Sequence, residues 1–365
     1  MTGSQIIVLA TPVFLALIAL EYAVGRSRGH DTYRAHDAMA SIGLGVMSQV
    51  TGVFGKALRV GLYAAVFEHV ALTVLPANSV WVWLFALVLY DFLYYWHHRG
   101  GHRIAVLWAA HAVHHQSEDY NLSTALRQTS SGFFFGWIFY LPMAVIGVPP
   151  LVFGTVALID LLYQYWVHTQ QIGKLGWFDR WFCAPSNHRV HHAVNERYLD
   201  KNYGGIFIIW DRLFGSFIEQ DEREPIIYGT RAPLHSFNPL WANLQVYRDL
   251  ALDSWRAGSW PDKLRVWIKP PGWRPTDVAA RWPKVAFEVD AMRKFDPAIS
   301  SRQMALAVAM FVIVLTLTSL FLWHAHQLDF GTRVAAALGI VALLWGVGAI
   351  TMRPRLALPQ MQRQT

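Results

Sequence analysis

Long apolar segments are the feature that most constrains the fold of this chain. Of its 365 residues, 54% are hydrophobic and 15% are charged, and several stretches approach the ~20 residues that a helix needs to span a bilayer. The pattern predicts an all-α, polytopic integral membrane helical bundle with about seven crossings. These are expected at residues 6–24, within 38–75, at 80–96, twice in a hairpin over 133–168 that bends at 148–150, and at 305–323 and 334–351.

Basic residues predict how the bundle is oriented. Arginines follow the first and third crossings, and 19 of the 31 basic residues lie between Lys174 and Arg302. The turns at 76–79 and 147–150 contain none. Since positive charge stays on the cytoplasmic side, we expect the histidine-rich segments to face the cytoplasm, at a bacterial inner membrane or the endoplasmic reticulum. This orientation requires an odd number of crossings within 38–75.

Histidine occurs in three short clusters, and two of them share the pattern H-x-x-H-H. On a helix, offsets of three and four residues return to the same face, so each triplet is expected to direct three imidazoles at one spot. A lone histidine is usually structural, but the repetition of this triplet beside a third cluster favours a metal site. Imidazole suits zinc, copper, iron and nickel alike. Eight imidazoles predict two ions, held by His98, His102, His111, His114, His115, His188, His191 and His192.

Other polar residues lie close to these clusters. His168 ends the fifth crossing at the same boundary and is a candidate ninth ligand, whereas His97 points away from His98 on a helix. Asp91 is an acid at membrane depth, which is a functional candidate by default. It either orients a ligand histidine or bonds to a tyrosine or a neighbouring helix.

Three residues flank the last cluster. Asn195, Asp200 and Tyr203 either position the ligands and bound water, as catalytic groups, or cap a helix and close a turn. Cys183 is the only cysteine, so disulfides and cysteine-held clusters are excluded, and we expect it to be a packing residue.

The clusters and their neighbours resemble the fatty acid hydroxylase and sterol desaturase superfamily of membrane proteins. The resemblance covers roughly residues 81–220. It rests on the segments 94–102, 111–115, 187–192, 198–204 and 210–217.

The resemblance implies a pair of iron ions on the clustered histidines and a reaction in which dioxygen and an external reductant hydroxylate or desaturate a lipid C–H bond. The branch that contains alkylglycerol monooxygenase is similar in residues 236–243 and 269–275 and in its extra carboxy-terminal hairpin. That branch implies a tetrahydropterin reductant. Sterols, fatty acyl lipids and alkylglycerols remain open as substrates.

Four regions are expected along the chain: membrane helices in 1–79, the catalytic domain in 80–220, an interfacial region rich in Trp and Pro in 221–302, and a hairpin with a tail in 303–365. Two other functions stay open, a histidine-ligated zinc hydrolase and a metal transporter. A transporter would place ligands along a crossing path. No nucleic-acid motif accompanies the net charge of +7, so nucleic acid is not expected as a partner.

Overall fold

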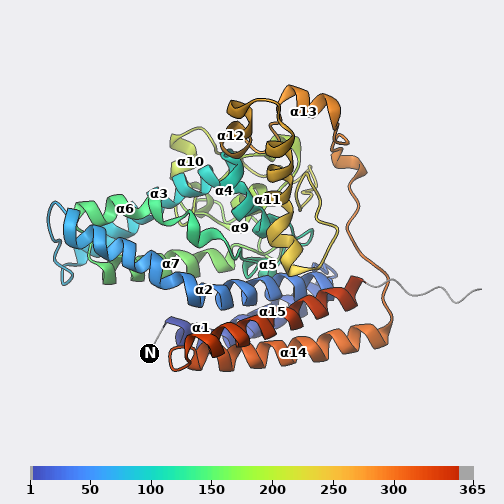
Figure 1. The fold of residues 1–365 in the computed structure, drawn as a ribbon, viewed down its shortest axis with the longest axis horizontal. Helices are drawn as coiled ribbons and strands as arrows, with labels where there is room; N and C mark the ends of the chain where they lie inside the picture. The colour runs from blue at the N-terminus through green and yellow to red at the C-terminus, as the bar shows by residue number, and fades with distance from the viewer. Residues whose placement is uncertain (1–2, 353–365) are drawn as a thin grey trace, which may run out of the picture.

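The computed structural model describes residues 3–352, apart from the side chains of Lys56, Ala57 and Arg59. This part of the chain is helical (Figure 1) and forms two isolated backbone bridges rather than strands, which confirms the predicted fold class. Its elements are α1 (Gly3–Ser27), α2 (Ala35–Val70), α3 (Val80–Arg103), α4 (Ala105–His115), α5 (Leu122–Ala125), η1 (Gly132–Phe134), α6 (Trp137–Ile146), α7 (Pro150–Trp166), α8 (Phe178–Trp181), α9 (Pro185–His191), η2 (Glu196–Tyr198), α10 (Ile209–Leu213), α11 (Pro239–Arg256), α12 (Trp260–Ile268), α13 (Thr276–Arg281), η3 (Val289–Ala291), α14 (Ser301–His324) and α15 (Phe330–Met352). The tail expected at 353–365 lies outside the described residues.

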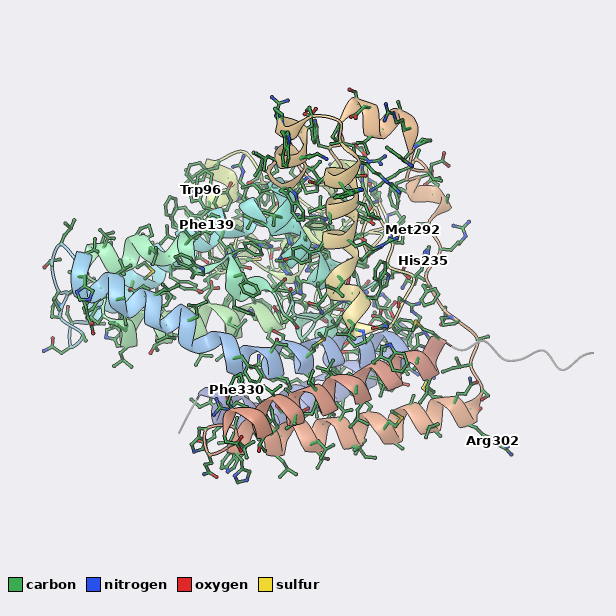
Figure 2. The ribbon with its side chains drawn as sticks, in the orientation of Figure 1. Trp96, Phe139, His235, Met292, Arg302 and Phe330 are labelled. Atoms are coloured by element: carbon green, nitrogen blue, oxygen red, sulfur yellow. The ribbon has the colours of Figure 1, made fainter. Side chains whose placement is uncertain are left out.

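Five helices are long and apolar enough to cross a membrane: α1, α2, α3, α14 and α15. In Figure 1 the α2–α3 turn and the α14–α15 turn lie toward the same end of the molecule. Figure 2 shows Phe330 and Arg302 at opposite ends of the α14–α15 hairpin, with Arg302 at the end away from these turns. Helix α2 is continuous, so residues 38–75 hold one crossing, in agreement with the odd number that the charge pattern requires.

The hairpin expected at 133–168 is formed by η1, α6 and α7. Helices α6 and α7 have 10 and 17 residues, so they are shorter than the other crossings, and the expected total of seven is approximate. Gly147 ends α6 in the left-handed region, at φ 99°. A Cβ atom there would lie 2.0 Å from the carbonyl oxygen of Thr73, so only glycine fits this turn. Pro150 then starts α7 at a position where its missing N–H costs nothing.

Helix α2 connects two hydrophobic cores. Its first half contributes Met39, Met47 and Val50 to a core with α14 and α15. Its second half contributes Tyr63 to a core with α3, α6 and α7, where the Tyr63 hydroxyl donates to the carbonyl of Val148 at 2.9 Å. The 36-residue α2 is about 54 Å long at 1.5 Å per residue, so one helix can bridge both packing units.

Residues 178–281, which include helices α8 to α13, form a cap at one end of the bundle (Figure 1). Helix α11 packs against α4 and α12, and its first turn is capped by the Asn238 side chain, which accepts from the backbone amides of Leu240 and Trp241. Cys183 lies in this cap and is fully buried, as expected of a packing residue. The cap therefore rests directly on α4, one of the helices that carry histidine clusters.

A buried ionic network joins α2 to the segment after α4. Arg127 is 2% exposed, and its Nε donates to the carbonyl of Val113 at 2.7 Å. Its positive charge acts on Asp37 of α2, which accepts from the Ser117 hydroxyl, but the two side chains do not form a direct ion pair within 4 Å. Arg34 also acts on the Asp37 carboxyl group. Arg127 therefore supports this region mainly through its buried hydrogen bond and adds a favourable longer-range charge.

We expect Arg127→Met to lower the free energy of unfolding by about 1–3 kcal/mol, because it leaves the buried Val113 carbonyl without its donor. Thermal unfolding in detergent measures the loss. The double variant Arg127→Met with Asp37→Asn should recover any part that comes from the lost charge, and Arg302→Met, at an exposed position, should change little. An unaltered unfolding temperature for Arg127→Met would contradict this role.

Candidate metal centre

The structure brings nine histidines together at the junction of α3, α4, α7 and α9. They form two groups, and within each group the candidate ligand atoms all lie within 4.8 Å of one another. The first group is His98, His102, His111, His115 and His191, and the second is His114, His168, His188 and His192. All eight expected ligands are present, and His168, the candidate ninth, joins the second group. The assignment of these residues as ligands remains a prediction.

The first group is centred on His111. Its Nε2 lies 3.0 Å from Nε2 of His98 on α3 and 3.0 Å from Nε2 of His115 on α4. The rings of His102 and His191 approach the same point, with centroids 4.7 Å apart. The Nε2 atoms of these last two are buried and have no hydrogen-bond partner. Five imidazoles from three helices thus converge on one small volume.

The second group is a chain of four histidines joined by three close nitrogen pairs. Nε2 of His168 lies 3.1 Å from Nε2 of His114 and 3.1 Å from Nε2 of His188. Nε2 of His192 lies 3.2 Å from Nε2 of His188. His168 follows the end of α7, so the membrane hairpin supplies one member of a group that otherwise comes from α4 and α9.

The H-x-x-H-H triplets do not each direct three imidazoles at one spot, which corrects the expectation from their spacing. His111 and His115 point into the first group, whereas His114 points into the second. The triplet on α9 divides in the same way but between the exchanged groups: His188 and His192 lie in the second group, and His191 lies in the first. At roughly 100° per residue, an offset of four returns to within about 40°, but an offset of three leaves about 60° on the other side. Each triplet therefore serves both groups.

Backbone carbonyls fix which nitrogen each ring presents. Nδ1 of His98 donates to Tyr203 O at 2.8 Å, and Nδ1 of His191 donates to Lys201 O at 3.0 Å. Nδ1 of His114 donates to Arg127 O at 2.9 Å, and Nδ1 of His168 donates to Gln164 O at 2.7 Å. A carbonyl can only accept, so each Nδ1 carries the proton and each Nε2 presents a lone pair to the centre.

This arrangement fits a bound cation. In the neutral rings of His114 and His168, both Nε2 lone pairs face each other at 3.1 Å, which is repulsive unless a positive charge lies between them. Two imidazole nitrogens about 2.0–2.1 Å from one metal ion lie about 2.9–3.4 Å apart at tetrahedral or octahedral angles. The observed spacings of 3.0–3.2 Å fall in that range. The residues therefore suit one ion in each group.

Burial keeps the rings outside the membrane helices in their neutral form. It lowers the pKa of His114 from 6.5 to about 4. It also lowers the pKa values of His115 and His192 well below 6.5, with neighbouring imidazoles adding to the effect. A neutral imidazole has a lone pair to give, so the site is prepared to bind a metal at neutral pH.

The segment 200–203 is bent so that two of its carbonyls reach the first group. Asp200 and Asn202 adopt the left-handed region, at φ 60° and 56°, which places the Lys201 and Tyr203 carbonyls on His191 and His98. The Asn202 side chain donates to the carbonyl of Asn187 at 3.0 Å. Asparagine and aspartate tolerate this conformation best among residues with a side chain, which explains their occurrence here.

The four predicted catalytic residues lie around the histidines rather than among them. Asp200 pairs with Arg103 at 2.6 Å and lies 3.9 Å from His102 Nδ1. The Tyr203 hydroxyl is buried without a hydrogen-bond partner, and its ring lies 5.3 Å from that of His102. Both therefore border the first group.

The other two predicted residues hold loops. Asn195 donates to Pro225 O and accepts from Ile227 N. Asp91 accepts from the Ile206 and Phe207 amides, so it holds the neighbouring chain segment instead of bonding to a ligand histidine. Of the two alternatives for Asp91, the structure favours the second.

Sequence reasoning missed the carbonyl acceptors of Arg127, Gln164 and Lys201, because a backbone oxygen leaves no signature in the sequence. It also assigned no chemical role to Asp211. Asp211 instead accepts from the amides of Tyr203 at 2.8 Å and Gly204 at 2.7 Å. Its position eight residues after Tyr203 was visible in the sequence, but the bend that brings the two together was not.

A cavity of about 760 Å³ adjoins both histidine groups. His98, His111, His114 and His168 form part of its wall, and the rest comes largely from apolar residues of α1, α2, α6, α7 and α14. Among the described side chains that line it, Asp160 is the only acidic one, and none is a lysine or an arginine. Val60, which is 61% exposed, also lines it, and the cavity is partly open rather than fully enclosed.

The fold and the site define a multi-pass membrane protein with two facing groups of histidines at the head of an apolar cavity. The Fatty acid hydroxylase family model matches residues 83–216, which include all nine histidines. Alkylglycerol monooxygenase from Danio rerio is 37% identical over 312 residues, covering 84% of this chain and 68% of that protein. The chain belongs to the fatty acid hydroxylase family.

Other relatives agree with this assignment. Alkylglycerol monooxygenase from Homo sapiens is 40% identical over 267 residues, covering 73% of this chain and 59% of that protein. An ornithine lipid hydroxylase from Rhizobium tropici is 29% identical over 132 residues, covering 36% of this chain and 40% of that protein. The chain thus spans about three fifths of the length of the human relative. No solved structure matches it.

We expect His111→Ala and His114→Ala to remove different metal ions. Because their rings belong to different groups, each variant should fall from about two bound ions per chain to about one. Elemental analysis measures the loss, and visible spectra of the cobalt-loaded proteins should differ between the two. His324→Ala, at an exposed position, is the control. Identical residual spectra for the two variants would contradict the division into groups.

The metal-free protein should lose stability as the pH falls from about 6.5 toward 4. The pKa of His114 is near 4 when folded and returns to about 6.5 when unfolded, so the unfolded chain binds protons that the folded chain excludes. Thermal unfolding of the chelator-treated protein between pH 7.5 and 4.5 measures this. His114→Ala should weaken the dependence. A flat profile would show that the rings are not held in their neutral form.

Proposed function

We propose that this protein is a membrane di-iron monooxygenase that inserts one oxygen atom of dioxygen into a C–H bond of a lipid. The observation that carries the proposal is the contact between two all-imidazole groups and a large, partly open apolar cavity lined by the long apolar helices. A hydrolase needs no such cavity, and a transporter needs ligands spread along its path. Membership of the fatty acid hydroxylase family supports iron as the metal.

The reaction requires an oxidant, a reductant and a positioned C–H bond. The lipid C–H, dioxygen, two electrons and two protons yield the alcohol and water. A bound iron pair supplies the activation of dioxygen. The chain itself would hold the two ions with uncharged imidazoles, and the nearby carboxylate of Asp200 would offset part of their positive charge. The family also contains proteins named desaturases, and the cavity does not distinguish hydroxylation from desaturation of the lipid.

The cavity favours an uncharged lipid. Its described lining holds no lysine or arginine that could pair with a phosphate or carboxylate. Neutral donors and acceptors, such as Gln128, Thr129 and Gln164, occur in the same wall. Apolar walls with a few polar groups are typical of small-molecule sites of roughly 300–1,000 Å³. We therefore propose an alkylglycerol as the substrate, in line with the names of the relatives.

The histidine groups lie at the cap end of the bundle, which we propose to be its cytoplasmic side. Basic residues are concentrated there, between Lys174 and Arg302. A lipid would enter from the bilayer, while a water-soluble electron donor would approach from the side of the cap. We propose a tetrahydropterin as this donor, on the strength of the alkylglycerol monooxygenase relatives.

The experiment uses protein purified in detergent, loaded with ferrous iron without oxygen, and supplied with tetrahydropterin. Oxygen uptake should depend on an alkylglycerol and should be weaker with its phosphorylated analogue, because the cavity offers that charge no partner. His191→Ala should lose iron and uptake together, whereas His324→Ala should keep both. Tightly held zinc, with no lipid-dependent oxygen uptake after iron loading under any reductant, would overturn the proposal.

A further inference from the structure

Two acidic side chains meet between α3 and α7, apart from the histidine groups. Asp91 on α3 is fully buried, and Asp160 on α7 is 2% exposed. A Cβ atom on Gly205 would lie 2.8 Å from Oδ1 of each, so both oxygens converge on the same stretch of backbone. The two oxygens can therefore be no more than about 5.6 Å apart, so the charge of one carboxyl group acts directly on the other.

The other partners of the two acids differ. Asp91 accepts three hydrogen bonds, from the Ile206 amide, from the Phe207 amide at 3.1 Å and from Trp210 Nε1 at 2.7 Å. Asp160 accepts one, from Gln164 Nε2 at 2.6 Å on its Oδ2, whereas its Oδ1 is buried without a hydrogen-bond partner. Two facing buried carboxylates cannot both be charged. Asp91, with three N–H donors, therefore carries the charge, and Asp160 carries the proton.

The surroundings offer no substitute for that proton. The titratable groups that face the pair are Tyr94, Tyr140, Tyr163 and Cys183, and none of them can be positively charged. Asp211, which binds the nearer part of the same loop, is an acid. Within the described part of the chain, a proton held between the two carboxyl groups is thus what permits Asp91 to remain buried and ionised.

The pair holds the loop that orients a ligand. Residues 203–207 are fixed at one end by Asp211, which accepts from the Tyr203 and Gly204 amides, and at the other by Asp91. Between these anchors, the Tyr203 carbonyl accepts from His98 Nδ1. We propose that Asp160, by sharing a proton with Asp91, is a positioning residue that fixes this loop and so keeps His98 aimed at the first histidine group.

This inference rests on the proposed metal centre, and its test reads metal binding rather than turnover. Asp160→Asn keeps a donor facing Asp91, so it should retain about two metal ions per chain and its unfolding temperature. In Asp91→Asn one oxygen becomes an NH2 group, which cannot accept from the N–H donors that Asp91 binds. The loop that receives His98 should then be released, and the variant should lose the ion of the first group. Asp296→Asn, at a side chain that is 57% exposed, is the control.

A second measurement isolates the shared proton. Raising the pH should remove it, place two charges face to face, and lower both metal retention and the unfolding temperature of the unaltered protein. Asp160→Asn cannot lose this proton and should lack that alkaline loss. The proposal is overturned if Asp160→Asn binds as little metal as Asp91→Asn. It is also overturned if Asp160→Asn loses metal and unfolding temperature at high pH as much as the unaltered protein does.

The alkaline comparison remains decisive even if Asp91→Asn fails to fold, because it uses only the unaltered protein and Asp160→Asn. The two proposals also fail separately. Absence of lipid-dependent oxygen uptake in the unaltered protein would defeat the proposed oxygenase. The metal and unfolding differences between the variants would still decide the role of Asp160.

Discussion

The rest of the centre depends on one electrostatic constraint: neutral imidazoles whose lone pairs face one another at about 3 Å must have a cation between them. The hydrogen bonds from Nδ1 of His114 and His168 to backbone carbonyls impose this, because they leave Nε2 of both rings without a proton. The Arg127 carbonyl belongs to a residue whose side chain bonds to Val113, and the Gln164 carbonyl belongs to helix α7. The buried polar contacts around the histidines therefore fix the direction of the ligands.

These anchors also explain why charged groups are buried in an otherwise apolar protein. Arg127 bonds to the α4 carbonyl of Val113 with its side chain and accepts from His114 with its own carbonyl. Asp211 and Asp91 bind successive amides of the loop that receives His98. A buried charge is retained at a cost in stability. Here the buried charges lie beside the histidine groups, where they help to hold the imidazole rings in fixed directions.

The membrane part and the centre are joined through α7 and the cavity. His168 follows α7 and belongs to the second group, while Asp160 and Gln164 of the same helix line the cavity. The short α6–α7 hairpin therefore supplies both a member of the second group and a wall of the space beside it.

The sequence by itself determined the helical membrane class, the histidines that gather and the family, because apolar length and helical spacing are local properties. Only the tertiary structure decided how each H-x-x-H-H triplet divides between the groups, since a rotation of 40° or 60° about a helix matters only once the facing helix is placed. The roles of Asp91 and Asp211 were likewise decided by backbone amides that lie 115 and 8 residues away from them. Contacts across such distances in the chain leave no pattern that a single sequence can reveal.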